Sequence, residues 1–139
     1  MEQEWIACLQ EAGYRVTAPR RAVLRALAES ARPLSPAELR ERGRRYYPSL
    51  GLVTVYRTLE VLEGLELVRR VHREDGCHAY APTSAGHVHL ILCQQCNRAV
   101  EFSGDDLSYL IARVERETGY RVQGHWLQLF GLCPQCREG

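Results

Sequence analysis

Apolar residues in the first half of the chain recur at the spacing of amphipathic helices. Residues 2–12 repeat apolar side chains every three or four positions, which predicts a first helix. A second helix is expected to begin after Thr17, because threonine is a good N-cap residue. A third is expected to begin at Ser35, which has the capping-box spacing to Glu38, and to run towards Tyr46.

A fourth helix is predicted over residues 51–64, and its apolar stripe decides which side chains face outward. Val55, Leu59 and Leu62 stand at i, i+4 and i+7, so this side would pack on the other helices. The polar and aromatic side chains between them then lie mostly off the stripe, namely Thr54, Tyr56, Arg57 and Thr58.

Two short strands are predicted after the helices, at residues 67–72 and 77–80. The sequence Glu-Asp-Gly at 74–76 is a turn signal between them. Helices followed by such a β-hairpin form the winged variant of the helix-turn-helix. The first half of the chain therefore predicts a DNA-binding type of domain.

The second half predicts a smaller unit of mixed structure. Residues 87–92 and 99–102 are expected as strands, Ser103 as the cap of a helix from about 104 to 118, and residues 120–132 as further strand. Each piece is too small to bury much surface alone, so a metal site and a partner subunit are expected to stabilise this half.

The predicted fold class is α+β, with an N-terminal winged helix-turn-helix domain followed by a small α/β domain. The first domain takes residues 1–82, a hinge takes residues 83–86, and the second domain takes residues 87–139. The hinge is placed there because Pro-Thr-Ser-Ala-Gly at 82–86 is the stretch with hinge-like composition.

Composition narrows the class of protein. The chain has 139 residues, 45% hydrophobic and 25% charged, as in globular domains. No stretch approaches the roughly 20 apolar residues of a membrane helix. The first four residues, Met-Glu-Gln-Glu, are acidic where a secretory signal would be basic. We therefore expect a cytoplasmic protein without membrane contact.

The net charge of +1 hides two clusters of arginine. The first lies between Glu11 and Glu29, a stretch that contains no acidic residue. Its members are Arg15, Arg20, Arg21 and Arg25. The second follows at Arg40, Arg42, Arg44 and Arg45. Clusters of this kind neutralise phosphates, although a solvated helix face has the same composition.

Four of the six cysteines form two C-x-x-C pairs, Cys93 with Cys96 and Cys133 with Cys136. Each pair presents two thiolates about one tetrahedral edge apart, and two pairs complete a closed four-sulfur zinc site. A closed site has no position for water, so its role would be structural. Redox thiols are the alternative. The chain shows no export signal and no βαβ setting around a C-x-x-C pair, and both observations favour a metal site.

Two histidines, His87 and His89, lie on one side of a predicted strand because strand side chains alternate. Such a pair is a common nucleus of a metal site, but about half of such pairs are plain surface histidines. Further candidate ligands lie in the same region of the chain: His72, Cys77, His78, Glu101 and His125. A set with one thiolate suits zinc, whereas an all-nitrogen and oxygen set suits iron or manganese.

On the fourth helix, Arg57 can donate two hydrogen bonds to guanine. Tyr56 can pack its ring on a thymine methyl group or reach a phosphate. A Tyr-Arg pair is also common on helix surfaces without any function. The pair indicates DNA binding only because it lies on a helix of a predicted winged helix-turn-helix domain.

In their order and spacing, these motifs resemble the ferric uptake regulator family of bacterial metal-dependent repressors. The resemblance spans nearly the whole chain. Besides the cysteine pairs, it is carried by Gly-Tyr-Arg-Val-Thr-Ala-Pro-Arg at 13–20, Thr-Val-Tyr-Arg-Thr-Leu at 54–59 and His-Val-His-Leu-Ile at 87–91. It implies a homodimer formed by the second domain, a double-stranded DNA partner with an A·T-rich palindromic operator, and a regulatory metal at the hinge.

The resemblance also assigns DNA contacts by position. Thr54, Tyr56 and Arg57 belong to the helix that enters the major groove. Arg15 resembles the family's minor-groove basic residue, which favours narrow A·T-rich grooves. Arg20 would hold a phosphate.

Departures from the family pattern bear on which metal is sensed. Iron- and peroxide-sensing members carry ligands where this chain has Arg32-Pro33, Ala81 and Ser108, and iron-type members have an acid in place of Val88. The remaining set is most similar to the zinc uptake regulator branch, and comprises His72, Cys77, one of His87 and His89, and Glu101. His125 would belong to an additional site or to the core.

The resulting hypothesis is a non-enzymatic repressor of metal-homeostasis genes with one structural Zn²⁺ and a second, regulatory Zn²⁺. The regulatory ion would join His72 and Cys77 to His89 and Glu101, and Fe²⁺ or Mn²⁺ is the alternative ion. The rivals are an iron, manganese or peroxide sensor of the same family, and a zinc storage or chaperone protein without DNA binding. A hydrolytic zinc enzyme would need an open zinc position beside a general base, and no H-E-x-x-H or comparable pattern is present.

Overall fold

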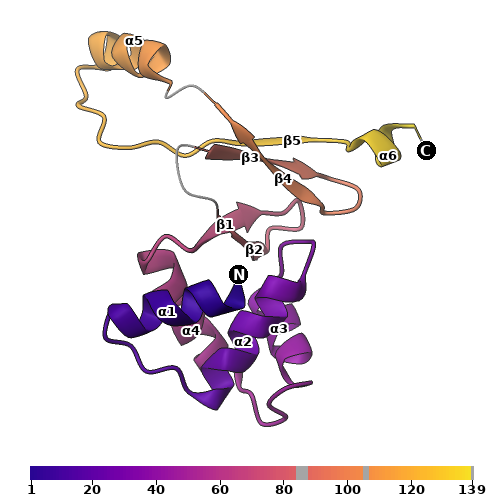
Figure 1. The fold of residues 1–139 in the computed structure, drawn as a ribbon. Helices are drawn as coiled ribbons and strands as arrows, with labels where there is room; N and C mark the ends of the chain where they lie inside the picture. The colour runs from indigo at the N-terminus through magenta and orange to yellow at the C-terminus, as the bar shows by residue number, and fades with distance from the viewer. Residues whose placement is uncertain (84–87, 105–106, 139) are drawn as a thin grey trace. The chain divides into compact units, whose positions relative to one another are not determined.

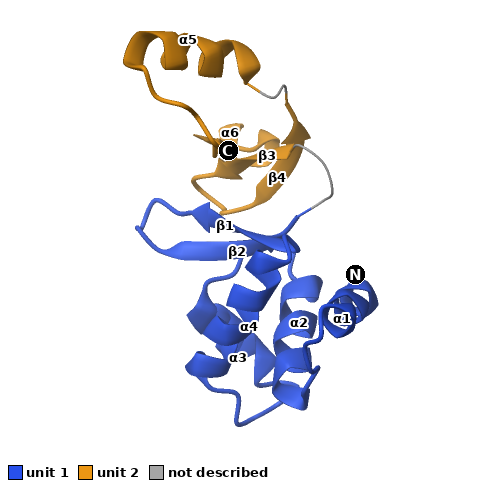
Figure 2. Ribbon diagram, turned by 90° about the vertical axis from the view of Figure 1, so that its left-hand side faces the viewer, with its two compact units in different colours: residues 1–84 blue, residues 85–139 orange. Residues whose placement is uncertain are grey.

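The structure, a computed structural model, describes residues 1–83, 88–104 and 107–138 (Figure 1). The chain divides into two compact units, residues 1–84 and 85–139 (Figure 2). The first unit is a winged helix and the second a small α/β unit, as the sequence predicts. Residues 84–86 of the predicted hinge lie outside the described residues.

Four helices make up most of the first unit: α1 (Glu2–Glu11), α2 (Ala18–Glu29), α3 (Pro36–Gly43) and α4 (Leu52–Gly64). The predicted caps are present. The Thr17 hydroxyl accepts a hydrogen bond from the Arg20 amide at 3.4 Å. The Ser35 amide donates to Glu38 Oε1 at 2.8 Å, while the Glu38 amide donates to the Ser35 hydroxyl at 3.2 Å. Local capping chemistry therefore sets these helix starts.

The third helix ends at Gly43, about one turn before the predicted end at Tyr46. A Cβ on Gly43 would meet Leu50 Cδ2 at 2.5 Å, so the chain needs this glycine to fold back tightly. Leu50 is fully buried after that turn. Burial of Leu50 thus ends the helix earlier than its local pattern indicates.

The core of the first unit is formed by the apolar stripes of the helices. Leu9, Leu24, Leu27, Leu39 and Leu62 are among its fully buried side chains. At about 25 cal/mol per Å² of apolar surface, burial of this kind is the main favourable term that holds the four helices together.

The wing is an antiparallel hairpin of β1 (Val68–His72) and β2 (His78–Pro82). Gly76 in the connecting turn has φ +82°, which a side chain would strain. The hairpin is extended by Leu34, which exchanges two backbone hydrogen bonds with Tyr80. This third strand-like contact has no signature in the sequence.

The second unit contains a three-stranded sheet in the order β4–β3–β5. β3 (Val88–Cys93) pairs antiparallel with β4 (Ala99–Ser103) and parallel with β5 (Gln128–Gly131). Helices α5 (Ser108–Thr118) and α6 (Pro134–Arg137) follow β4 and β5.

Two sequence expectations for this unit are wrong. Ser103 does not cap the helix: it ends strand β4, and α5 begins at Ser108 after Leu107 in the left-handed region at φ 59°. The expected strand over 120–132 shrinks to Gln128–Gly131, because its ladder with β3 covers only Leu90–Cys93. A strand persists only where a partner supplies hydrogen bonds.

In the part of the chain that the structure describes, no helix combines the length and apolar character required to cross a bilayer.

Candidate metal centre and nucleic-acid interface

The two cysteine pairs meet because β3 and β5 are parallel neighbours. Cys93 is the last residue of β3 and pairs with Gly131 at the end of β5. The Gln94 amide donates to the Gly131 carbonyl at 2.8 Å and closes this edge. The carboxyl ends of parallel strands lie at the same edge of a sheet, so the turns that follow them bring all four cysteines together.

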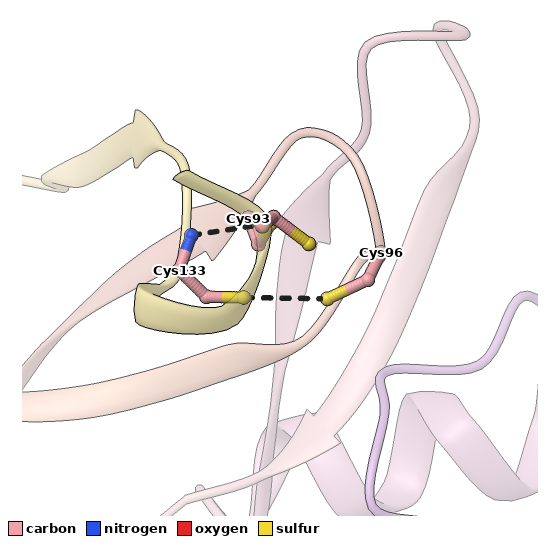
Figure 3. A group of neighbouring side chains, drawn as sticks. Cys93, Cys96 and Cys133 are labelled. Atoms are coloured by element: carbon pink, nitrogen blue, oxygen red, sulfur yellow. Dashed lines mark hydrogen bonds between the residues drawn. The ribbon is translucent and has the colours of Figure 1, made fainter. Parts of the chain in front are cut away.

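The four thiols form one cluster. The sulfurs of Cys93, Cys96, Cys133 and Cys136 all lie within 4.8 Å of one another. The Sγ atoms of Cys96 and Cys133 point towards each other at 3.9 Å (Figure 3). A disulfide requires about 2.05 Å, and all four cysteines are free. Tetrahedral zinc with Zn–S bonds of about 2.3 Å needs sulfurs about 3.8 Å apart, so the donor set fits zinc.

Backbone amides prepare the cluster for a cation. Backbone N–H groups, first that of Cys96 and then that of Cys133, stabilise the Cys93 thiolate and lower its pKa to about 6. The second of these contacts is 3.4 Å from the Cys133 nitrogen to Cys93 Sγ (Figure 3). The Cys136 amide lowers the pKa of Cys133, whereas the hydrogen bond to Cys133 raises the pKa of Cys136. Thiolates are the species that bind zinc.

In the first unit, the candidate regulatory ligands His72 and Cys77 lie at the tip of the wing. His72 pairs with His78 across the hairpin, and their ring centroids are 4.5 Å apart. Cys77 is exposed, and its amide donates to Asp75 Oδ1 at 2.9 Å. The buried Nδ1 of His78 has no hydrogen-bond partner among the described residues. The wing thus presents a thiol and an imidazole a few residues apart.

In the second unit, His89 is 4% exposed and lies among other rings. Its ring centroid is 5.6 Å from that of Phe102 and 5.7 Å from that of His125. Gly104 completes the enclosure, since a Cβ there would stand 2.5 Å from His89 Cδ2. The structure therefore brings His89 and His125 together, although they are 36 positions apart in the sequence.

The strand register separates His89 from Glu101. His89 pairs with Phe102 and Leu90 pairs with Glu101. Directly opposed residues of an antiparallel pair share a face, so His89 and Glu101 lie on opposite faces of the sheet. This differs from the expectation that both hold one ion. His87 lies outside the described residues.

The α4 helix presents the predicted base-reading residues. Tyr56 is 52% exposed and Arg57 is exposed, whereas Val55, Leu59 and Leu62 are buried. Thr54 is half-buried. Thr58 differs from the expectation: it is 1% exposed, and its hydroxyl donates to the Thr54 carbonyl at 2.7 Å. A hydroxyl satisfied within the helix can enter the core, which the apolar pattern does not reveal.

The loop before α2 carries the other predicted DNA contacts. Arg15 is exposed, and its carbonyl accepts a hydrogen bond from Arg20 Nη1 at 2.8 Å. The contact links the loop to the first turn of the helix, so Arg15 and Arg20 belong to one local structure.

Two residues at these sites escaped the sequence analysis. Gly104 had no signal, because a glycine between a strand and a helix is ordinary. Arg73 is nearly buried, and its Nη2 atom lies 2.8 Å from Glu38 and 2.7 Å from the Pro33 carbonyl, so it ties the wing to the start of α3. In the sequence, the position of Arg73 beside the wing turn was the only sign that it could connect the wing to another element.

Comparison with known proteins finds relatives that match the chain over nearly its whole length. The peroxide-responsive repressor PerR of Staphylococcus aureus is 27% identical over 136 residues, which span 98% of this chain and 91% of that protein. The structure of holo XcZur is 29% identical, with a TM-score of 0.77 and coverage of 99% and 97% of the two chains. A zinc uptake regulator complexed with zinc and DNA is 21% identical, with a TM-score of 0.79 and coverage of 99% and 96%, a likeness of fold.

The model of the ferric uptake regulator family matches residues 11–130. This match runs from the end of α1 through the wing and takes in the paired histidines and the first cysteine pair. The chain therefore belongs to the ferric uptake regulator family.

Proposed function

We propose that this protein is a homodimeric, metal-responsive repressor that binds double-stranded DNA and senses zinc. The single observation that carries the DNA-binding role is the α4 helix. Its apolar side is buried in the winged helix, and Tyr56 and Arg57 stand exposed on the other side. A helix docked in this way can enter the major groove and present its side chains to base edges.

The four-cysteine cluster would hold a structural zinc. Its donor set is all sulfur, its four sulfurs lie within 4.8 Å of one another, and one member is buried at the end of β3. When bound, such an ion supplies folding free energy rather than reactivity. Here it would join the end of β3 to the segment after β5.

Zinc as the sensed metal is supported by the wing. Cys77 offers an exposed thiol and His72 an imidazole, a pair that suits borderline-soft Zn²⁺ better than Fe²⁺ or Mn²⁺. Glu101, on the Leu90 face of the sheet, is a candidate ligand from the second unit. We assign His89 and His125 to a separate histidine pair, because the register sets His89 on the other face and the His125 ring lies 5.7 Å from it.

A ligand set drawn from both units would make the metal favour one arrangement of the chain. An ion that binds that arrangement alone shifts the population towards it. A coupling of about 1–3 kcal/mol raises DNA affinity by roughly 5–150-fold. The repressor would then occupy promoters of metal-uptake genes when zinc is plentiful.

The homodimer is supported by apolar surface on the second unit. Helix α5 buries none of its residues, and Tyr109 on it is 95% exposed. On the following segment, Trp126, Leu129 and Phe130 are also exposed. A second copy of the chain would cover surface of this kind, and a two-fold dimer would match a palindromic operator.

The test is fluorescence anisotropy of an A·T-rich palindromic duplex, titrated with protein at buffered free zinc and separately at buffered manganese. Binding that zinc alone switches on supports the proposal. Binding switched on by manganese would assign the protein to the iron, manganese or peroxide branch. Two observations support that alternative, the similarity to PerR and the His89–His125 pair. No sequence-preferring binding with either metal would leave a zinc storage protein as the remaining class.

A further inference from the structure

The two arginine clusters of the sequence converge on one hollow of the first unit. The hollow is a cavity of about 550 Å³ whose charged lining comes from Arg21, Arg25 and Arg45. Tyr46, Val16 and two alanines of α2 complete it. All three arginines are exposed, so the cavity opens to solvent rather than enclosing a ligand.

The packing of α3 on α2 brings these residues together. Arg21 and Arg25 are one turn apart on α2 and share a face. Gly43 at the end of α3 lies against Ala22, whose carbonyl oxygen would be 3.6 Å from a Cβ at Gly43. This close approach delivers Arg45, two residues later, to the same side of α2.

One of the three guanidinium groups is held in place. Arg25 Cζ lies 4.3 Å from the centre of the Tyr46 ring, and its Nε donates to Glu29 Oε1 at 3.2 Å. Tyr46 in turn donates its hydroxyl hydrogen to Glu29 Oε2 at 2.5 Å. The hydrogen bond to Glu29 uses the Nε–H of Arg25, which leaves its terminal N–H groups as possible donors to an acceptor in the cavity.

The charge of the cavity is therefore positive in spite of Glu29. The carboxylate is occupied by Arg25 and Tyr46 and does not line the cavity. The hydrogen bond from Tyr46 also lowers the pKa of Glu29, which keeps the Arg25–Glu29 pair ionised over a wide pH range. Planar guanidinium groups match the oxygens of phosphate and carboxylate groups with paired hydrogen bonds, and phosphate is the anion that DNA presents.

We propose that this cavity seats a stretch of the DNA backbone, whose neighbouring phosphates are held by Arg21, Arg25 and Arg45. The inference rests on the proposed DNA-binding function and adds a contact outside the base-reading helix. The backbone of a polymer fits better than a free anion, because the cavity is open and much larger than one phosphate group. Such a contact positions the protein on the duplex and carries no base preference.

The experiment measures the salt dependence of DNA binding for Arg21→Ala and Arg45→Ala, with zinc present. Each variant is expected to lower the slope of log K against log salt by about one. Each should weaken binding to the operator and to random duplex by the same factor, roughly eightfold near 0.1 M salt. The matched control is Arg42→Ala, an exposed arginine of the same cluster that does not line the cavity.

Titration of the zinc-loaded protein with inorganic phosphate, without DNA, forms the second arm. Saturable phosphate binding that Arg21→Ala removes, together with an unchanged salt slope, would reassign the cavity to a small anion. Equal slopes for the cavity variants and Arg42→Ala would also overturn the proposal, while leaving the DNA-binding function intact. If the wild type binds no DNA, the proposed function itself fails, and the DNA-backbone contact fails with it.

Discussion

Gly104 lies directly against the imidazole of His89, and the contact leaves no room for a side chain. A Cβ at Gly104 would stand 2.5 Å from Cδ2 and 3.0 Å from Nε2 of His89. The His89 ring therefore packs against Gly104 and against the rings of Phe102 and His125. The missing side chain at Gly104 decides where the imidazole of this buried histidine can lie.

We expect Gly104→Ala to displace the His89 ring. Overpacking of this kind costs about 1–3 kcal/mol of folding free energy. The displaced ring should show altered histidine resonances in NMR spectra and weaker binding of metal beyond the structural zinc. Gly124→Ala is the control, because nothing lies within 4 Å of a Cβ at that position. If both variants behave alike, Gly104 does not position His89.

Removal of a cluster thiol should destabilise the second unit. Cys93→Ser is expected to lose one zinc per chain and several kcal/mol of stability, since structural zinc contributes about 10–16 kcal/mol of binding free energy in small zinc domains. Metal analysis and thermal unfolding measure both effects. Cys8→Ser, a half-buried cysteine on α1 outside the cluster, should keep its zinc and nearly its full stability. Normal melting of Cys93→Ser would contradict a structural role.

Removal of the wing thiol should act on regulation alone. Cys77 is exposed, so Cys77→Ser is expected to keep the fold and the cluster zinc. It should lose the rise of roughly 5–150-fold in DNA affinity that zinc coupling provides. The measurement is anisotropy with and without buffered zinc, again with Cys8→Ser as control. An unchanged zinc response would remove Cys77 from the regulatory site.

Replacement of the exposed arginine on α4 should relax base preference. Arg57→Ala is expected to cost about 1–3 kcal/mol on the operator and much less on random duplex, because a bidentate contact to guanine reads sequence. Competition between the two duplexes gives the specificity ratio. An equal loss on both would mean that Arg57 contacts only phosphate, as we propose for Arg21 and Arg45.

The zinc affinity of the cluster should depend on pH with a change of slope. The lowered pKa of Cys93, about 6, keeps this thiolate ionised above pH 6, so its proton is not released on binding there. As the pH falls through 6, Cys93 becomes protonated and zinc must displace one further proton. The slope of log affinity against pH should steepen by about one, as measured with a competing chelator from pH 5 to 8. A constant slope across this range would contradict a lowered pKa of Cys93.

Much of the fold follows from local chemistry that a sequence displays directly. The caps at Thr17 and Ser35, the stripe of α4 and the turn at Gly76 each depend on residues within a few positions of one another. For the same reason each C-x-x-C pair indicated a metal-binding turn, since two residues between cysteines determine how the two sulfurs of one pair converge. These features need no knowledge of distant contacts.

Other features depend on contacts between residues far apart in the sequence, and the tertiary structure alone decided them. The parallel pairing of β3 with β5 joined the cysteine pairs, and the register of β3 with β4 set His89 and Glu101 on opposite faces. Packing at Gly43 brought Arg45 to the arginines of α2. A sequence shows which groups are present and their local geometry. Which of them meet depends on how strands pair and helices pack, because that pairing and packing minimise the free energy of the folded chain as a whole.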